Sequence, residues 1–210
     1  MPAPWLPLLS VLSCPLGGDL LGLETPPAAR APAPPDLADE LVGFRTAVVP
    51  GTLVGPIDLG ERGAVVAAIR CGGKADRPRA PCDLVVAHLS PVAGALVLSG
   101  VVQTFPVHAR ARAPGDYAVT MLALRDLAGD AAPELVVRWR VGETSWLGAV
   151  SWLGFTRVFG PELVVDADCA GALVLGCDAD ARPELTASCG GEPRAAWRWD
   201  TRGARFVKRR

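Results

Sequence analysis

The chain has 210 residues, of which 50% are apolar and 20% charged, and its formal net charge is −1. These values exclude a largely disordered chain and a strongly basic protein that coats nucleic acid, so we expect a folded globular chain with no nucleic-acid partner. Asn is absent and Ala, Arg, Gly and Pro dominate, which indicates a bacterium with a GC-rich genome.

The first segment, residues 1–14, is uncharged and mostly apolar, and is too short to span a bilayer as a helix. It ends in Val11-Leu12-Ser13-Cys14, which resembles a bacterial lipobox. The resemblance implies a signal peptide over residues 1–14, lipidation of Cys14, and export to the periplasm or outer membrane with a lipid anchor in the membrane. The segment lacks the basic residues that usually begin a signal peptide, so a plain apolar N-terminus is the alternative.

The six cysteines contain no CxxC pair, so their spacing does not suit a zinc site and suits disulfide bonds better. Disulfide bonds favour an oxidising compartment. Cys71 and Cys82 bracket a polar loop, and a disulfide between them is the pairing we expect. Lipidation of Cys14 would leave five cysteines and one unpaired thiol, whereas a free Cys14 would permit three disulfides. The remaining cysteines, whose pairing stays open, are Cys169, Cys177 and Cys189.

Residues 15–40 are rich in Pro, Ala, Gly and acidic residues and are predicted to form an extended tether, with a short helix over residues 36–42 as the best helical alternative. From residue 41 to 210 the pattern changes to short apolar runs broken by Gly, Pro or Asp, which predicts strands. The predicted strands span 44–49, 64–70, 84–89, 94–98, 101–107, 117–124, 135–141, 148–153, 155–159, 163–166, 172–175, 195–199 and 205–208. We therefore expect an all-β, antiparallel domain.

An internal repeat is indicated by Leu84, Leu135 and Leu185, which follow polar loops and are spaced by 51 and 50 residues. A period near 50 residues with about four strands per unit is typical of propeller blades. Three units are fewer than the roughly four to eight blades that close a propeller. The expectation is therefore three four-strand repeats, propeller-like or irregular.

Two loops of the repeat carry alternating acidic residues, at Asp126, Asp130 and Glu134 and at Asp178, Asp180 and Glu184. Both resemble the Asp-rich loop of FG-GAP and VCBS repeats in bacterial surface proteins. The resemblance implies an integrin-type β-repeat and a possible calcium site at these six residues, because calcium takes about six to eight oxygen ligands. Each loop has fewer acidic residues than the family pattern, so the preferred interpretation is a loop that sets hairpin geometry, with no cofactor.

Other candidates are His88 and His108, which are the only histidines and belong to no recognised catalytic motif. The tryptophans and phenylalanines between residues 139 and 159, with Trp197 and Trp199, are expected to lie in the core, with sugar stacking as the alternative. Arg194 to Arg210 carries a net charge of +6, which could dock on anionic lipid or polysaccharide.

Three functions follow from these features. The leading one is a non-enzymatic lipoprotein of the cell envelope whose β-repeat domain binds or scaffolds an unknown protein or glycan. The second is calcium-dependent adhesion or glycan binding through the acidic loops. The third is a secreted hydrolase that uses His88 or His108.

Overall fold

The structure, a computed structural model, describes residues 18–20, 34, 36–42, 45–108, 111, 113–165 and 171–209. In this part of the chain the regular structure consists of strands, one helical turn and two short 3-10 helices. The helical elements are α1 (Leu37–Glu40), η1 (Gly60–Arg62) and η2 (Pro114–Asp116). The strands are β1 (Thr46–Val48), β2 (Val54–Asp58), β3 (Ala64–Lys74), β4 (Arg77–Val92), β5 (Ala95–Val107), β6 (Tyr117–Arg125), β7 (Glu134–Val141), β8 (Thr144–Ser151), β9 (Arg157–Val165), β10 (Gly171–Cys177), β11 (Pro183–Cys189), β12 (Glu192–Asp200) and β13 (Arg205–Lys208).

The strands form three antiparallel sheets that follow one another along the chain. Their orders are β1-β3-β4-β5, β6-β7-β8-β9 and β10-β11-β12-β13. The first sheet has a fifth strand, because β1 and β2 pair with successive parts of the same edge of β3. The prediction of an all-β antiparallel fold with three successive repeat units is confirmed, and the sheets close no barrel.

The three repeat leucines are fully buried, and each lies on the second strand of an antiparallel hairpin, β3–β4, β6–β7 or β10–β11. Leu84 is on β4, Leu135 on β7 and Leu185 on β11. The spacing of about 50 residues therefore reports a recurring structural position.

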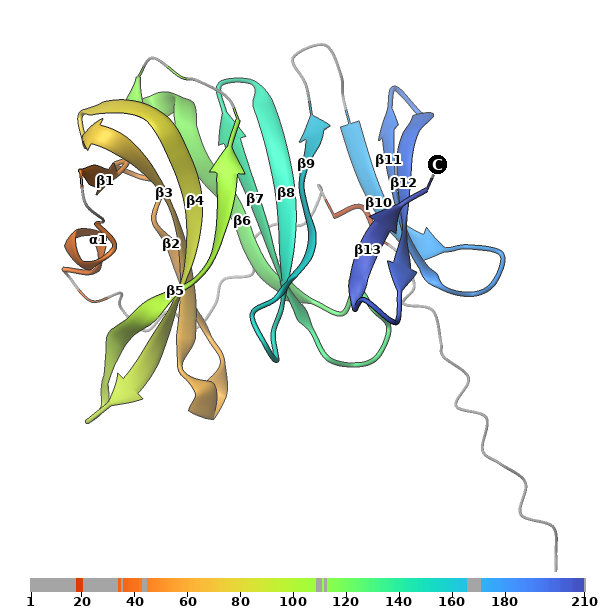
Figure 1. The fold of residues 1–210 in the computed structure, drawn as a ribbon, viewed down its shortest axis with the longest axis horizontal. Helices are drawn as coiled ribbons and strands as arrows, with labels where there is room; N and C mark the ends of the chain where they lie inside the picture. Colours follow the sequence, from red (N-terminus) through yellow and green to blue (C-terminus); the bar gives the residue numbers. More distant parts are fainter. Residues whose placement is uncertain are drawn as a thin grey trace, which may run out of the picture.

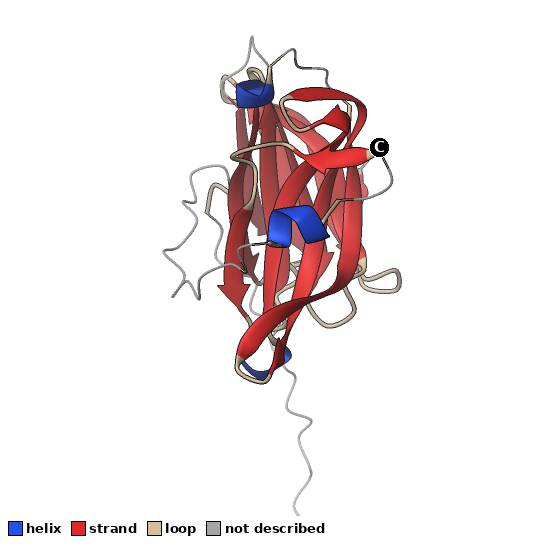
Figure 2. Cartoon of the chain, turned by 90° about the vertical axis from the view of Figure 1, so that its left-hand side faces the viewer, coloured by secondary structure: helices blue, strands red, loops and turns tan. Residues whose placement is uncertain are grey.

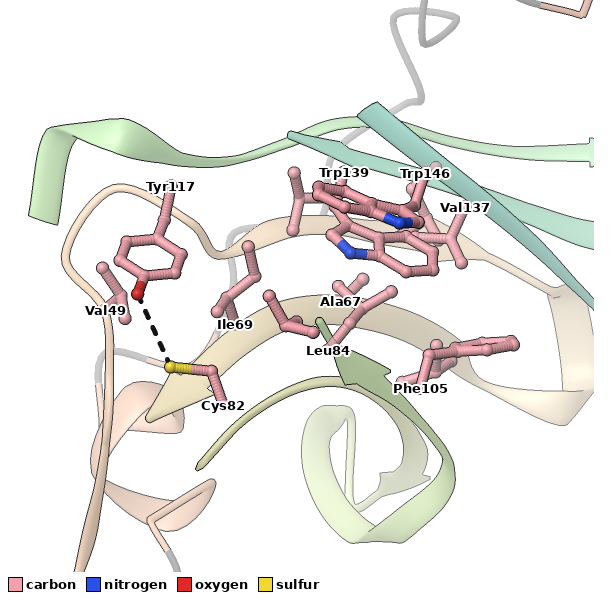
Figure 3. Close-up of a cluster of buried hydrophobic side chains, with 14 of the residues drawn as sticks. Val49, Ala67, Ile69, Cys82, Leu84, Phe105, Tyr117, Val137, Trp139 and Trp146 are labelled. Carbon is pink, nitrogen blue, oxygen red and sulfur yellow. Dashed lines mark hydrogen bonds between the residues drawn. The ribbon is translucent and has the colours of Figure 1, made fainter. Parts of the chain in front are cut away.

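The sheets are stacked face to face in chain order, and the second sheet lies in the middle (Figure 1). Because side chains alternate along a strand, β7 supplies both interfaces. Leu135, Val137 and Trp139 pack toward the first sheet, and Val136 packs toward the third. Figure 3 shows the first interface, where the rings of Phe105 and Trp139 are 5.6 Å apart.

The two outer faces of the stack differ in chemistry. Helix α1 lies over the first sheet, where Leu37 and Leu41 pack with residues such as Val66 and Val85 (Figure 2). The outer face of the third sheet carries charged side chains, among them Arg198 and Glu184. An open stack needs each outer face to be covered or polar, and the two ends of this stack meet that need in different ways.

Parts of the predicted tether contact the domain. Besides α1, Asp19 forms a β-bridge with Val174, and Leu20 is buried in the interface between the second and third sheets. The predicted signal peptide and Cys14 lie outside the described residues. Within the described residues, no helix is long and apolar enough to cross a membrane.

Candidate functional site

The predicted disulfide between Cys71 and Cys82 is confirmed. The two residues face each other across the β3–β4 pair, next to a break in its register, and the tyrosine hydroxyl of Tyr117 lies 3.7 Å from the sulfur of Cys82 (Figure 3). The disulfide therefore fixes the first long hairpin where it meets the second sheet.

Cys177 and Cys189 are also disulfide-bonded. They lie at opposite ends of the β10–β11 pair, since Cys177 is opposite Pro183 and Cys189 is opposite Gly171. Six residues of strand separate these positions, or about 20 Å at 3.3 Å per residue, so the two sulfurs do not bond to each other. The other cysteines of the sequence, Cys14 and Cys169, lie outside the described residues.

The first acidic loop uses its carboxylates to bind its own backbone. Asp126 accepts hydrogen bonds from the N–H groups of Gly129 at 2.6 Å and Ala131 at 3.0 Å. Asp130 accepts from the N–H group of Ala132 at 2.9 Å. These bonds hold Ala131 in the left-handed region, with φ of 64°. The oxygens that a calcium ion would need are thus used to shape the hairpin.

Glu134, the last acid of this loop, is buried, with 4% of its surface exposed, and accepts a 2.7 Å hydrogen bond from the N–H group of Leu127. Burial disfavours the charged form and raises the pKa of Glu134 to about 7, against the opposing effect of the hydrogen bond. Glu134 is therefore a buried carboxyl that titrates near neutral pH.

The second acidic loop is neutralised by arginine. The guanidinium of Arg198 lies 3.0 Å from the carboxylate of Asp178 and 3.7 Å from that of Asp180. Glu184 forms a 2.7 Å ion pair with Arg209. Hydrogen bonds from the backbone N–H groups of Arg182 and Asp180, together with Arg198, lower the pKa of Asp178. Among the described residues, no group of three or more His, Cys, Asp or Glu side chains converges in a metal-binding arrangement.

The two histidines do not form one site. His88 is paired with Gly100, whereas His108 follows Val107, which is paired with Cys82 at the far end of the β4–β5 hairpin. The Nε2 atom of His88 lies 2.5 Å from the carbonyl oxygen of Arg62, and Nδ1 lies 2.7 Å from the hydroxyl oxygen of Ser99, whose hydrogen is donated to the backbone carbonyl of His88 at 2.9 Å. Among the described residues, the hydrogen-bond partners of the His88 ring are a serine hydroxyl and a backbone carbonyl, and no carboxylate is among them.

Three of the five tryptophans in the described part of the chain lie in the core. Trp139, Trp146 and Trp197 are buried, and Trp199 packs at the edge of the second interface. As the alternation predicts, Trp197 and Trp199 share one side of β12, and Arg198 points to the other side and pairs with Asp178. Sugar stacking on these rings is therefore restricted to the partly exposed Trp152 and Trp199.

A hollow of about 610 Å³ forms an open groove between β9 of the second sheet and β13 of the third. Phe159 and Phe206, whose rings are 6.0 Å apart, form its floor, and Gln103 of β5 closes one side. Gly160 is required on this wall, because its φ is 70° and a Cβ there would lie 2.3 Å from the carbonyl oxygen of Leu147. The close approach of β9 to β8 thus shapes the groove.

The groove is basic. Its cations are Arg157, Arg205 and Lys208, all exposed, and its carboxylate is Glu162. None of the three cations forms an ion pair with a described carboxylate. The sequence signalled only part of this site, through the basic segment after Arg194, because Arg157 lies 48 residues before Arg205 and reaches the groove through sheet packing.

One groove cation is held in place. The guanidinium of Arg157 donates a 2.7 Å hydrogen bond to the carbonyl oxygen of Thr104 and lies 4.9 Å from the centre of the Phe105 ring. Lys208 lies over the ring of Trp197, at 5.6 Å. A second hollow of about 270 Å³ shares Val207 and Lys208 with the groove and is also lined by Arg182 and Trp199, so basic side chains continue beyond the groove.

Comparisons of the chain with models of protein families, with curated proteins and with solved structures find no significant match.

Proposed function

We propose that the protein is a non-enzymatic, exported protein of the bacterial cell envelope that binds an acidic polysaccharide in the groove between β9 and β13. The observation that carries this proposal is the set of three exposed cations, Arg157, Arg205 and Lys208, that face one groove without a described carboxylate partner. Such a set attracts a polyanion, and Arg157 is already oriented by Thr104.

The shape of the groove favours a polymer of acidic sugars. The groove is open and has polar walls, whereas an enclosed small-molecule pocket is mostly apolar. The aromatic rings beneath it, Phe159 and Phe206, are buried and offer no platform on which bases could stack. Carboxylates repeated along a chain can meet Arg157, Arg205 and Lys208 in turn, and the Gln103 amide can bind hydroxyl groups.

Export is supported by the disulfides, since Cys71, Cys82, Cys177 and Cys189 are all oxidised and such bonds persist outside the cytosol. The lipid anchor at Cys14 competes with this disulfide pattern and is not part of the proposal. Cys177 and Cys189 are both oxidised and do not bond to each other, so within one chain the partners that they need are the two other cysteines, Cys14 and Cys169. A lipid on the sulfur of Cys14 would leave one of them without an intramolecular partner. The intact mass of the mature protein tests the anchor, which is rejected if Cys14 carries no lipid.

Affinity electrophoresis through gels that contain alginate, a polyuronate, tests the binding site, with neutral dextran as the comparison polymer. We expect alginate to retard the protein and high salt to abolish the effect. The double variant Arg205→Glu/Lys208→Glu should bind alginate at least about tenfold more weakly, because two attractive charges become repulsive.

The matched control is Arg77→Glu/Arg79→Glu, which makes the same change in net charge on the exposed β3–β4 hairpin. This control should bind alginate within about twofold of the wild type. Equal losses in both variants would show a response to net charge alone, and the proposed site would be rejected.

A further inference from the structure

Two turns at one end of the molecule expose apolar side chains. The first is the tip of the β4–β5 hairpin, Pro91–Leu98, and the second is the β8–β9 turn, Trp152–Phe155. Figures 1 and 2 show the hairpin tip projecting at the end of the sheets that also carries η1, and Figure 1 shows the β8–β9 turn at this end. We refer to these two turns as the apolar end.

Exposed large hydrophobic side chains gather here. Seven such residues are found in the described part of the chain, and four of them belong to these turns or to the adjoining part of β5. These four are Val92 at 55%, Val97 at 45%, Val101 at 42% and Leu153 at 66% exposed. Exposed apolar surface that is concentrated at one place marks an interaction site, whereas scattered single residues need no explanation.

The hairpin is apolar on both of its faces. No ionisable residue occurs between His88 and His108, and Pro91–Leu98 contains no polar side chain. Leu96 and Leu98 pack partly on the α1 side of the sheet, and Val97 is exposed between them. A tight turn through Ala93, with φ of 49°, and Gly94, with φ of 84°, keeps the tip narrow. A groove on a partner protein would cover only one face of this hairpin tip, whereas a lipid layer would surround both faces. Apolar side chains on both faces therefore favour lipid as the occupant.

Side chains at the base of the two turns join them. The guanidinium of Arg62 lies 5.1 Å from the centre of the Trp152 ring, and the rings of His88 and Phe155 are 5.5 Å apart. Tryptophan and arginine are the side chains that settle where hydrocarbon meets water. Two exposed acids, Asp58 beside Pro91 and Leu96 and Glu61 beside Arg62, outnumber the one arginine, so this end offers no net attraction to anionic lipid.

We propose that the apolar end inserts into the surface of a lipid bilayer, with Val92, Val97 and Leu153 below the headgroups and Trp152 and Arg62 at their level. The unpaired backbone edge of the hairpin limits the depth of insertion, because hydrocarbon cannot satisfy its polar groups. The interaction requires hydrophobic insertion and no anionic headgroup, and it is independent of polysaccharide binding in the β9–β13 groove.

Co-sedimentation with vesicles tests this proposal. The full chain is used with Cys14 shown by intact mass to be unmodified, so that no lipid anchor contributes. We expect equal binding to phosphatidylcholine vesicles with and without phosphatidylglycerol, and at least tenfold weaker binding of Val92→Glu/Leu153→Glu. The matched control Val42→Glu/Val174→Glu, at two exposed valines elsewhere, should bind like the wild type.

Four results would overturn the proposal. The first is a wild-type protein that does not sediment with phosphatidylcholine vesicles, and the second is a Val92→Glu/Leu153→Glu variant that binds these vesicles like the control. The third is binding that requires phosphatidylglycerol and is lost in Arg205→Glu/Lys208→Glu, which would place headgroups in the basic groove. The fourth is a wild-type dimer that Val92→Glu/Leu153→Glu converts to a monomer, which would make a second copy the occupant.

Discussion

The guanidinium of Arg157 on β9 donates a 2.7 Å hydrogen bond to the backbone carbonyl of Thr104 on β5. This bond ties the edge of the second sheet to the edge of the first, and it fixes a cation at the mouth of the groove. The same guanidinium lies 4.9 Å from the centre of the Phe105 ring, so Arg157 also contacts the core of the first interface. Sheet packing and the candidate site therefore share one side chain.

Replacement of Arg157 should affect binding more than folding. The change Arg157→Gln removes the charge and the bond to Thr104, so we expect several-fold weaker alginate binding and a loss of about 1 kcal/mol in the free energy of unfolding. Affinity electrophoresis and urea unfolding measure the two effects. The control Arg77→Gln, on an exposed strand end, should change neither quantity, and unchanged alginate binding of Arg157→Gln would remove this residue from the site.

The contact between Gly148 and Phe105 tests the packing of the first two sheets. A Cβ on Gly148 of β8 would lie 2.7 Å from the Phe105 ring, which is fully buried. We expect Gly148→Ala to lower the free energy of unfolding by about 1–3 kcal/mol, because a tightly packed ring must shift. Gly176→Ala is the matched control, since a Cβ there meets no atom within 4 Å. Equal stability of the two variants in urea would contradict the packing described.

Glu134 makes stability depend on pH. Its pKa is about 7 in the folded chain and 4.5 in a free side chain. Below pH 4.5 the carboxyl is protonated in both states, whereas between pH 4.5 and 7 the unfolded chain loses its proton first. The free energy of unfolding should therefore fall as pH rises through this window, by up to about 3 kcal/mol, and level off above pH 7.

The variant Glu134→Gln should lose this slope, because its neutral amide can still accept the hydrogen bond from Leu127 and does not ionise. Urea unfolding at a series of pH values between 4 and 8 measures the difference. Glu184→Gln, a change at a carboxylate paired with Arg209, should retain the wild-type slope in this window. An unchanged slope in Glu134→Gln would show that another group causes the dependence.

The disulfide pattern is a direct check on strand register. Peptide mapping of the unreduced protein should find one link between Cys71 and Cys82, with Cys177 and Cys189 in two different links. Reduction should lower the free energy of unfolding by about 2–4 kcal/mol per structural disulfide. A peptide that joins Cys177 to Cys189 would be incompatible with the β10–β11 pairing.

Short-range patterns predicted most strands, and β13 has the predicted bounds. Elsewhere, Gly, Ser or Pro residues within a strand were wrongly taken as strand ends. The predicted strands 94–98 and 101–107 form one strand, β5, because Ser99 and Gly100 lie at a bulge and do not end the pairing with β4. Likewise β4 extends from Arg77 to Val92 and includes part of the predicted loop before Cys82. Strands β2 and β11 were missed, because Gly-Pro in β2 and small polar residues in β11 weaken the apolar signal.

The acidic loops and the groove differ in how far sequence can predict them. Asp126 and Asp178 bind backbone groups within five residues of themselves, so a local pattern carries the information. The groove joins Arg157 to Arg205 and Lys208 through the contact of two sheet edges. That contact depends on the order and tilt of whole sheets, which no local periodicity encodes.

The central claim is that the groove between β9 and β13 binds acidic polysaccharide, and NMR mapping tests it most directly. Alginate oligomers are added to ¹⁵N-labelled protein, and the amide signals are followed during the titration. We predict saturable shifts at Arg157, Phe159 and residues 205–208, with little change on the equally exposed basic hairpin around Arg77. Shifts centred on that hairpin, or no saturable shifts at β9 and β13, would contradict the claim.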